Sequence, residues 1–214
     1  PIFEEVVNKD KFTVKSSQRL PMDLPIEPID MRYSYHPIGN QGYTGSCIGW
    51  GVSNGALQIE AWKSKVLPFT SFFSPKATWL ASRATDSFTR NNFAFLALEG
   101  TTVEAALKFA KNYGQCLDEW MPNWGDLPMG FDDFKSIAGK YKIKSYNYIG
   151  NSFDDVKRYL STGKPVINVL KTDAKFMRLY GESKLNTFEI PSSGLHGLHC
   201  TCFVGITKED ELIV

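Results

Sequence analysis

The sequence is built around one segment, Asn40-Gln41-Gly42-Tyr43-Thr44-Gly45-Ser46-Cys47-Ile48-Gly49-Trp50. A glycine-rich turn ends in a cysteine that opens an apolar helix, six residues after a glutamine. The N-terminus of a helix carries partial positive charge and unpaired N–H groups, which favour the nucleophilic thiolate form of Cys47. Gln41 can offer a side-chain N–H, and Cys47 its backbone N–H, to one developing oxyanion. The segment therefore predicts acyl-transfer chemistry at Cys47.

At these residues the chain resembles the papain-like cysteine peptidases, whose motif is a Gln, a glycine-rich turn and Gly-Ser-Cys at a helix start. The step from Gln41 to Cys47 is the same. The resemblance is to the bacterial and viral branch, because Asp30-Met31-Arg32 stands at about the place of that branch's Asp-Leu-Arg. Thr44 and Ile48 depart from the Cys-Gly-Ser-Cys-Trp form of the plant and lysosomal branch.

The base that a cysteine nucleophile needs is usually histidine. His36 is interpreted as loop surface, whereas His196 and His199 precede an apolar run. The resembled family has a Gly six residues after its catalytic His, and Gly205 fits that step from His199 but not from His196. The resemblance therefore implies His199 as the acid/base, with His196 as the alternative.

The activity that the resemblance implies is hydrolysis of peptide bonds through a Cys47 thioacyl-enzyme, with Gln41 at the oxyanion and His199 as acid/base. It also implies that Gly100 and Leu198 bind the peptide or protein substrate; Gly100 lies in a segment similar to the family's Asp-x-Gly. No cofactor is implied. We expect no metal site either, because His199, Cys200 and Cys202 are too close together for a usual zinc-ligand spacing.

The third catalytic residue of the family is an Asn in an Asn-Ser-Trp-Gly motif, which this sequence does not contain. Three explanations stay open: the remainder is on another polypeptide, the chain is incomplete, or another group orients His199. Two alternative functions follow. One is a catalytically weak or inactive papain-fold protein used for binding or assembly. The other is a different Cys–His acyl-transfer enzyme, such as an amidase or a transglutaminase.

The fold class predicted by periodicity is α+β, papain-like, with a helical first half packed against a β-rich second half and the active site at the seam. Helices are expected over about 47–65, 75–85, 101–113, 131–139 and 152–163, and strands over 142–149, 165–170, 199–206 and 212–214. Ser74-Pro75 is interpreted as the start of the second helix, Thr101 to Glu104 as a capping box at the third, and Asp132 and Ser152 as caps of the fourth and fifth. The β-branched run 165–170 is typical of a buried strand. The glycines of the first helix predict close backbone packing around it.

The division that we expect has three parts. Residues 1–28 are an N-terminal arm or short pro-segment, 29–130 a helical subdomain with the nucleophile, and 131–214 a β-rich subdomain with the base, interpreted as incomplete at its C-terminal end. An intramolecular contact of the N-terminal arm is one expected partner interaction.

Composition excludes some classes of partner. Lys and Arg number 24 and Asp and Glu 23, so nothing in the charge favours nucleic acid or an anionic membrane. No apolar run approaches the length of a membrane span. Cys116, Cys200 and Cys202 are interpreted as small buried hydrophobes, which favours a reducing compartment over a secreted disulfide scaffold.

Overall fold

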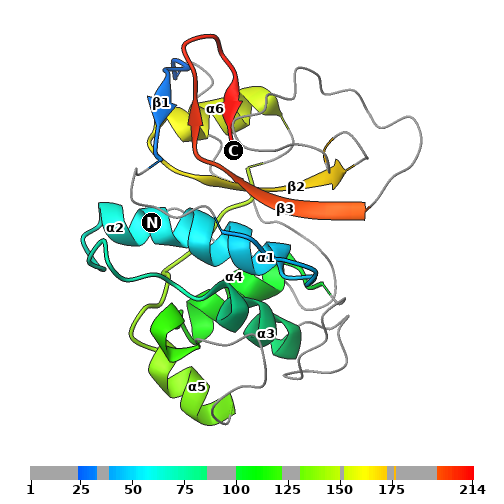
Figure 1. The fold of residues 1–214 in the computed structure, drawn as a ribbon. Coiled ribbons are helices and arrows are strands. Elements are labelled where there is room, and N and C mark those ends of the chain that lie inside the picture. The colour runs from blue at the N-terminus through cyan, green and yellow to red at the C-terminus, as the bar shows by residue number, and fades with distance from the viewer. Residues whose placement is uncertain are drawn as a thin grey trace.

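The computed structural model describes residues 24–32, 39–85, 100–121, 131–149, 152–172, 176 and 197–214. One long helix crosses the middle of the molecule (Figure 1). The strands and α6 lie on one side of this helix, and α3, α4 and α5 lie on the other. The central helix is therefore the element that both halves share.

The central helix is assigned as three consecutive pieces, α1 (Cys47–Gly49), a π-helical segment η1 (Trp50–Leu57) and α2 (Gln58–Lys63). Helices predicted from periodicity are found close to their expected bounds: α3 (Pro75–Thr85), α4 (Val103–Asn112), α5 (Phe131–Ala138) and α6 (Phe153–Ser161), with a short 3₁₀ turn η2 (Asp118–Trp120). The π-helical stretch was not expected, because no residue pattern distinguishes it from an α-helix.

Glycines on the central helix let neighbouring elements approach its backbone, as the sequence predicted. A Cβ added at Gly49 would stand 2.1 Å from the Pro75 carbonyl oxygen at the start of α3. One added at Gly51 would stand 2.7 Å from the Sγ of Cys200, and one at Gly55 2.8 Å from the Cβ of Cys202. Side chains at these three positions would therefore push α3 and the β3 strand away from the helix.

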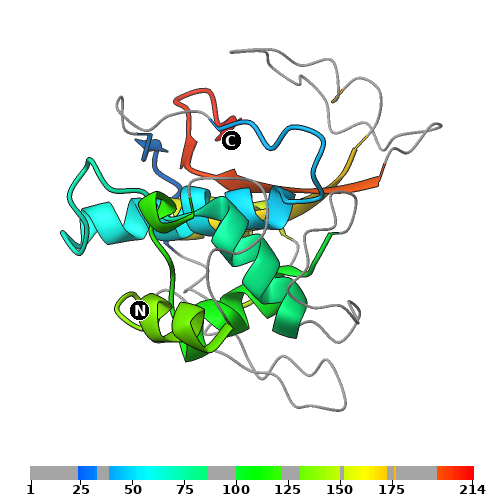
Figure 2. The same ribbon diagram turned by 60° about the horizontal axis from the view of Figure 1, so that its bottom comes forward.

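Two antiparallel sheets lie on the side of the central helix opposite α3, α4 and α5. β2 (Val166–Thr172) pairs with β3 (Gly197–Phe203), from Val166 opposite Phe203 to Thr172 opposite Gly197. β1 (Ile29–Asp30), β4 (Gly205–Ile206) and β5 (Leu212–Ile213) form the second sheet in the order β1-β4-β5. β3 runs along the central helix in both ribbon views (Figures 1 and 2).

The predicted strand over 199–206 divides at Val204. The Val204 N–H donates to the Ile213 carbonyl at 2.8 Å, and the Val204 carbonyl accepts from the Met31 N–H at 2.9 Å. The strand therefore changes partners there, from β2 to β1 and β5. The strand expected over 165–170 is found as β2, but its predicted burial holds only in part, since Val166 is buried and Val169 is 44% exposed.

The predicted strand over 142–149 is not a strand in the structure. Its backbone bonds to the end of a helix instead, with the Ile143 N–H donating to the Ala110 carbonyl at 3.2 Å. Tyr146 is buried beside α4, and Ile149 packs with the strands and α6. Lys142, Lys144 and Tyr148 are exposed, whereas Ile143 and Ile149 are partly buried. The apolar alternation therefore belongs to a half-covered connection between the two halves, without a neighbouring strand.

Two helix starts differ from the predicted caps. The N-cap of α4 is Thr102, whose Oγ1 accepts from the Ala105 N–H at 3.1 Å, so the cap lies one residue after the predicted Thr101. Glu104 pairs with Lys108 at 2.6 Å instead of reaching back to the cap. α5 begins at Phe131, so Asp132 lies in its first turn and is not its cap.

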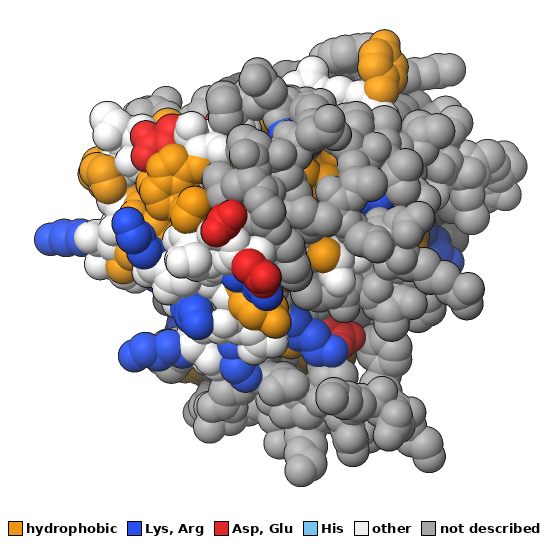
Figure 3. Space-filling view, turned by 90° about the horizontal axis from the view of Figure 1, so that it is seen from below, with side chains coloured by type: hydrophobic (Ala, Val, Ile, Leu, Met, Phe, Trp, Pro, Cys, Tyr) orange, Lys and Arg blue, Asp and Glu red, His pale blue; other side chains and the backbone are white. Residues whose placement is uncertain are grey.

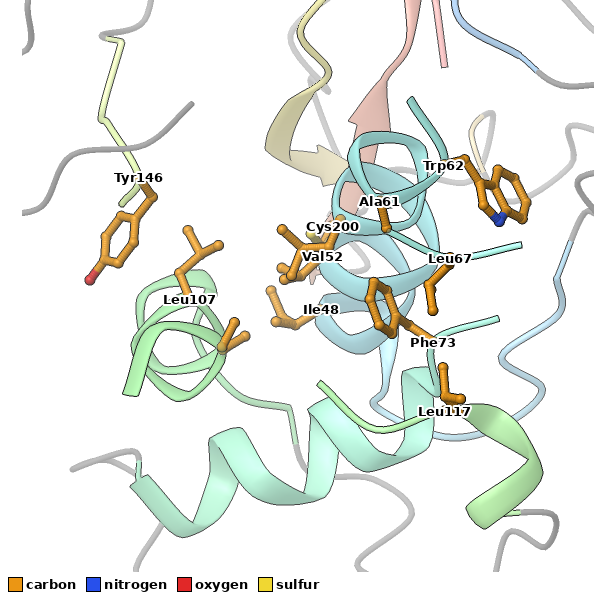
Figure 4. Close-up of a cluster of buried hydrophobic side chains, with 13 residues drawn as sticks. Ile48, Val52, Ala61, Trp62, Leu67, Phe73, Leu107, Leu117, Tyr146 and Cys200 are labelled. Carbon is orange, nitrogen blue, oxygen red and sulfur yellow. The ribbon is translucent and has the colours of Figure 1, made fainter. Parts of the chain in front are cut away.

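The core between the two sides is continuous across the central helix. Ile48 and Val52 point from this helix toward Leu107 of α4, and Cys200 of β3 lies beside Val52 (Figure 4). The polar Gln58 is fully buried in the same helix and ties it to the following loop, accepting from the Phe73 N–H at 2.6 Å and donating to the Ser71 carbonyl at 3.0 Å.

The surface seen from below carries Lys, Arg, acidic and hydrophobic side chains interspersed over the coloured atoms (Figure 3). This mixture agrees with the near balance of charge in the sequence. Within the described ranges, the helices are all too short or too polar to cross a membrane.

Candidate active site

Cys47 is the first residue of α1, and its partly buried side chain packs against the core cluster of the central helix. The first residues of a helix have backbone N–H groups with no partner inside the helix. Ser46 occupies the N-cap position without capping by its side chain. Its hydroxyl is fully buried and lies 2.6 Å from the Thr44 hydroxyl instead.

The turn before Cys47 is held by hydrogen bonds between its own residues. Gly42 has a φ of +60°, which only glycine adopts without strain, and its N–H donates to the Asn40 side chain at 2.8 Å. The Thr44 hydroxyl donates to the Gln41 carbonyl at 2.7 Å, and the Gln41 side-chain amide donates to the Thr44 carbonyl at 2.8 Å. This reciprocal pair fixes the orientation of the Gln41 side chain.

The contact of Thr44 with Gln41 in this turn was not identified from the sequence. The sequence showed only that Thr44 replaces a cysteine of the plant and lysosomal motif. Its hydroxyl bonds to the Gln41 carbonyl and lies against the Ser46 hydroxyl, so it links the two ends of the turn. The signal was available in principle, because a Thr hydroxyl readily bonds to backbone groups nearby in the chain.

Gly100 lies beside this turn although it is far away in the sequence. Among the described residues, a Cβ added there would have the Gly45 carbonyl oxygen as its neighbour, at 3.9 Å. The position is exposed, so the backbone edge of Gly100 faces solvent next to the residues that precede Cys47. Glu99 and the loop before it lie outside the described residues.

His199 lies on β3, opposite Leu170 of β2. Neighbouring side chains on a strand alternate between faces. Cys200 faces Gly51 of the central helix, so His199 belongs to the other face of the strand, where the ring of Phe176 has its centroid 5.4 Å away. Partial burial lowers the pKa of His199 below its usual value.

The structure therefore brings the strand of His199 and the helix of Cys47 into contact, but it does not join the two side chains directly. Among the described residues, no hydrogen bond connects the Cys47 thiol and the His199 ring. Leu198, the preceding residue on β3, is 69% exposed at the strand end. The alternative histidines, His36 and His196, lie outside the described residues.

The remaining cysteines and the acidic residues form no metal-binding group in the part of the chain that the structure describes. All four cysteines are described and none is in a disulfide. Burial raises the pKa of Cys116 and of Cys202 to about 12, which keeps both as neutral thiols. As predicted, Cys116, Cys200 and Cys202 are buried.

Comparison with known proteins finds similarity in structure but not in sequence. No family model matches the sequence, and no curated protein matches it in a sequence search. Xylellain, a cysteine protease from Xylella fastidiosa, superposes with a TM-score of 0.68 over 97% of this chain and 80% of its own, at 18% identity. The Carica candamarcensis cysteine protease CMS1MS2, solved in complex with E-64, superposes with a TM-score of 0.54 over 86% of this chain and 78% of its own, also at 18% identity.

The fold is papain-like. The prediction of an α+β, papain-like architecture is thereby confirmed, and the structures it resembles are cysteine proteases. Identities this low establish the fold alone. Activity, the roles of the site residues and the bacterial or viral branch stay predictions.

Proposed function

We propose that the chain is a cysteine-type endopeptidase that hydrolyses peptide bonds through a thioacyl intermediate on Cys47. One observation supports this above all: the papain-like fold starts its central helix at Cys47 and lays the strand of His199 along that helix. The helix that carries the nucleophile is thus in contact with the strand that carries the base, and acyl transfer requires such a pair of groups on neighbouring elements.

The first step is attack of the Cys47 thiolate on the substrate carbonyl carbon, which places negative charge on the carbonyl oxygen. Two donors are suited to that oxygen, the backbone N–H of Cys47 and the side-chain amide of Gln41. A primary amide has two N–H bonds, and Thr44 engages the Gln41 amide through one hydrogen bond. The second N–H can then serve the oxyanion while the first keeps the side chain in place.

His199 supplies the proton transfers. As an imidazolium it protonates the leaving amine, and as a neutral base it then activates the water that releases the acyl-enzyme. Burial alone favours the neutral ring, whereas a nearby thiolate favours the charged one. The ion pair therefore requires the Cys47 and His199 side chains to move closer together, as catalytic groups often do when substrate binds.

The substrate in this proposal is a peptide or protein whose backbone lies across the turn before Cys47. Gly100 offers an exposed backbone edge beside Gly45, and Leu198 an exposed apolar side chain beside His199. No cofactor enters this mechanism.

The decisive experiment is labelling of Cys47. The folded chain is treated with E-64, the compound in complex with the Carica neighbour, and the modified residue is located by peptide mass mapping. We expect one adduct, on Cys47, and none in Cys47→Ala. Cys116→Ala is the matched control, because it removes a different cysteine that is buried. Labelling of a folded protein at another cysteine, or peptide cleavage by Cys47→Ala, would contradict the mechanism.

The histidine assignment is tested with His199→Ala and His196→Ala in parallel. Loss of a general acid/base typically lowers the rate by a factor of about 10² to 10⁴. We expect that loss in His199→Ala and a near-normal rate of peptide hydrolysis in His196→Ala. The reverse result would move the role to His196.

The N-terminal residues 1–28 form a further part of the proposal, as an arm that restricts access to the site. Residues 24–28 are anchored on α6, where the Glu27 N–H donates to the Ser161 hydroxyl at 2.8 Å. A truncation that removes residues 1–23 keeps this anchor. Faster labelling of Cys47 after truncation would support an inhibitory arm, and an unchanged rate would contradict it.

A further inference from the structure

Cys200 is the buried cysteine that approaches Cys47. Its Sγ lies 2.7 Å from the point where a Cβ on Gly51 would stand. Gly51 is four residues after Cys47, about one helical turn along, and residues so spaced lie on one helix face with Cβ atoms about 5–6 Å apart. The Cys200 sulfur therefore lies against the same helix face as Cys47.

Core packing and charge agree with this placement. Cys200 belongs to the buried cluster against which the Cys47 side chain packs. Burial, followed by interaction with the Cys47 and Cys202 thiols, raises the pKa of Cys200 well above the usual range of a thiol. The other two cysteines lie elsewhere: Cys202 contacts Gly55, one turn further along the helix, and Cys116 packs in the cluster of α3 and α5.

We propose that Cys47 and Cys200 form a reversible disulfide when a peroxide oxidises the site, so that Cys200 protects Cys47 from irreversible oxidation. This inference rests on the reactive Cys47 of the proposed function. The glycine at position 51 permits it, because any side chain there would separate the strand that carries Cys200 from the helix.

The chemistry has two steps. Hydrogen peroxide transfers an oxygen atom to the Cys47 thiolate, giving the sulfenic acid and, after proton uptake, water. The Cys200 sulfur then attacks the Cys47 sulfur, the S–O bond breaks, and the Cys200 proton leaves with the hydroxide as a second water. Cys47 is oxidised first because it is partly exposed, whereas Cys200 is buried and remains a protonated thiol.

The product of peroxide oxidation distinguishes a Cys47–Cys200 pair from a catalytic thiol that has no second cysteine in reach. Without a second cysteine in reach, excess peroxide converts a sulfenic acid to the sulfinic acid, which common thiol reductants do not reverse. With Cys200 in reach, the disulfide forms in competition with this second oxidation. A dithiol such as dithiothreitol then restores both thiols and is itself oxidised to its cyclic disulfide.

The first test needs no variant. The chain is treated with hydrogen peroxide, remaining thiols are blocked, and the protein is digested without reductant and mapped by mass spectrometry. We expect a peptide pair that joins Cys47 to Cys200 and is lighter by two hydrogen atoms than the separate thiols. Conversion of Cys47 to the sulfinic acid with Cys200 still free, or a disulfide to another cysteine, would overturn the proposal.

The second test measures recovery of E-64 labelling after peroxide and then dithiothreitol, each protein being normalised to its own untreated sample. Wild type should recover most of its labelling, and Cys200→Ala less than about a fifth of it. Cys202→Ala is the matched control, because it removes a thiol from the same strand face one turn further from Cys47, and it should recover like wild type. Equal recovery in Cys200→Ala and wild type would contradict the proposal.

A Cys200→Ser variant covers the possibility that truncation to alanine disturbs the core, and circular dichroism establishes that each variant is folded. Failure of the proposed function is seen separately, since untreated wild type would then not label at Cys47. The disulfide map does not depend on peptidase activity.

Discussion

Gly51→Ala tests how closely β3 approaches the central helix. The added Cβ would stand 2.7 Å from the Cys200 Sγ and 3.3 Å from the Thr201 carbonyl oxygen. Alanine in place of glycine stabilises a helix by about 1 kcal/mol. Overpacking of a core costs about 1–3 kcal/mol. We therefore expect a net loss of about 1 kcal/mol in the free energy of unfolding.

Cys200→Ala in the same protein removes the atom responsible for the closest contact. In that background the nearest remaining atom is the Thr201 carbonyl oxygen at 3.3 Å, and a shift of a few tenths of an ångström relieves this contact. Gly51→Ala should then be neutral or stabilising by up to about 1 kcal/mol. The two backgrounds together predict a coupling energy of about 1–2 kcal/mol, within the range for residues in contact.

Gly55→Ala and Cys202→Ala, one turn further along the helix, are the control pair, and they should show no such coupling energy. The Cβ of Gly55→Ala would stand 2.8 Å from the Cβ of Cys202, an atom that Cys202→Ala retains. Removing the Cys202 sulfur relieves only a 3.4 Å contact. Gly55→Ala should therefore cost a similar free energy of unfolding in both backgrounds, with a coupling energy close to zero.

The assay is urea unfolding followed by tryptophan fluorescence, with the slope against urea concentration checked for constancy across variants. For a chain of this size, 1 kcal/mol corresponds to a change of about 2–4 °C in Tm. A Gly51→Ala variant more stable than wild type would refute the close approach of β3. A cost that Cys200→Ala leaves unchanged would refute the position of the Cys200 sulfur, and with it the geometry of the disulfide.

Three further predictions concern a cap, a buried amide and a histidine. Thr102→Ala should lower the free energy of unfolding by about 0.5–2 kcal/mol through loss of the α4 cap, while Thr102→Ser, which keeps a capping hydroxyl, stays within about 0.5 kcal/mol of wild type, both by urea unfolding; a Thr102→Ala variant as stable as wild type would contradict the cap. Gln58→Met should cost about 1–3 kcal/mol because the Phe73 N–H, 2.6 Å from the Gln58 side chain, would lose its acceptor; a variant as stable as wild type would show that this bond is dispensable. The pKa of His199 is lower in the folded chain than in the unfolded chain, so the unfolded chain binds the proton more tightly. The stability that is present above pH 6.5 therefore declines as the pH falls through 6.5 toward the folded-state pKa, and the difference in Tm between wild type and His199→Gln should change over this interval. A difference that stays constant with pH would contradict the partial burial of the ring.

Secondary structure was predictable wherever a local signal was strong. Ser74-Pro75 marked the start of α3, and Ser152 the cap of α6, because such starts depend on residues within one turn of each other. The prediction of a strand over 142–149 failed because alternation of apolar residues indicates an extended segment with one covered side, and it does not indicate whether a neighbouring strand is present. That distinction depends on distant parts of the chain.

The features of the candidate site likewise fall into those set by neighbouring residues and those set by distant ones. The sequence alone determined the turn at Gln41, the cysteine at a helix start and the glycines that keep one helix face open, because each follows from residues close together in the chain. Only the tertiary structure decided that Thr44 holds Gln41, that Gly100 lies beside Gly45, and that Cys200 contacts the helix face of Cys47. The last two contacts join segments about 50 to 150 residues apart, so no local preference encodes them. The first depends on the rotamer of Gln41, which the local bonding preference of Thr44 favours but does not fix.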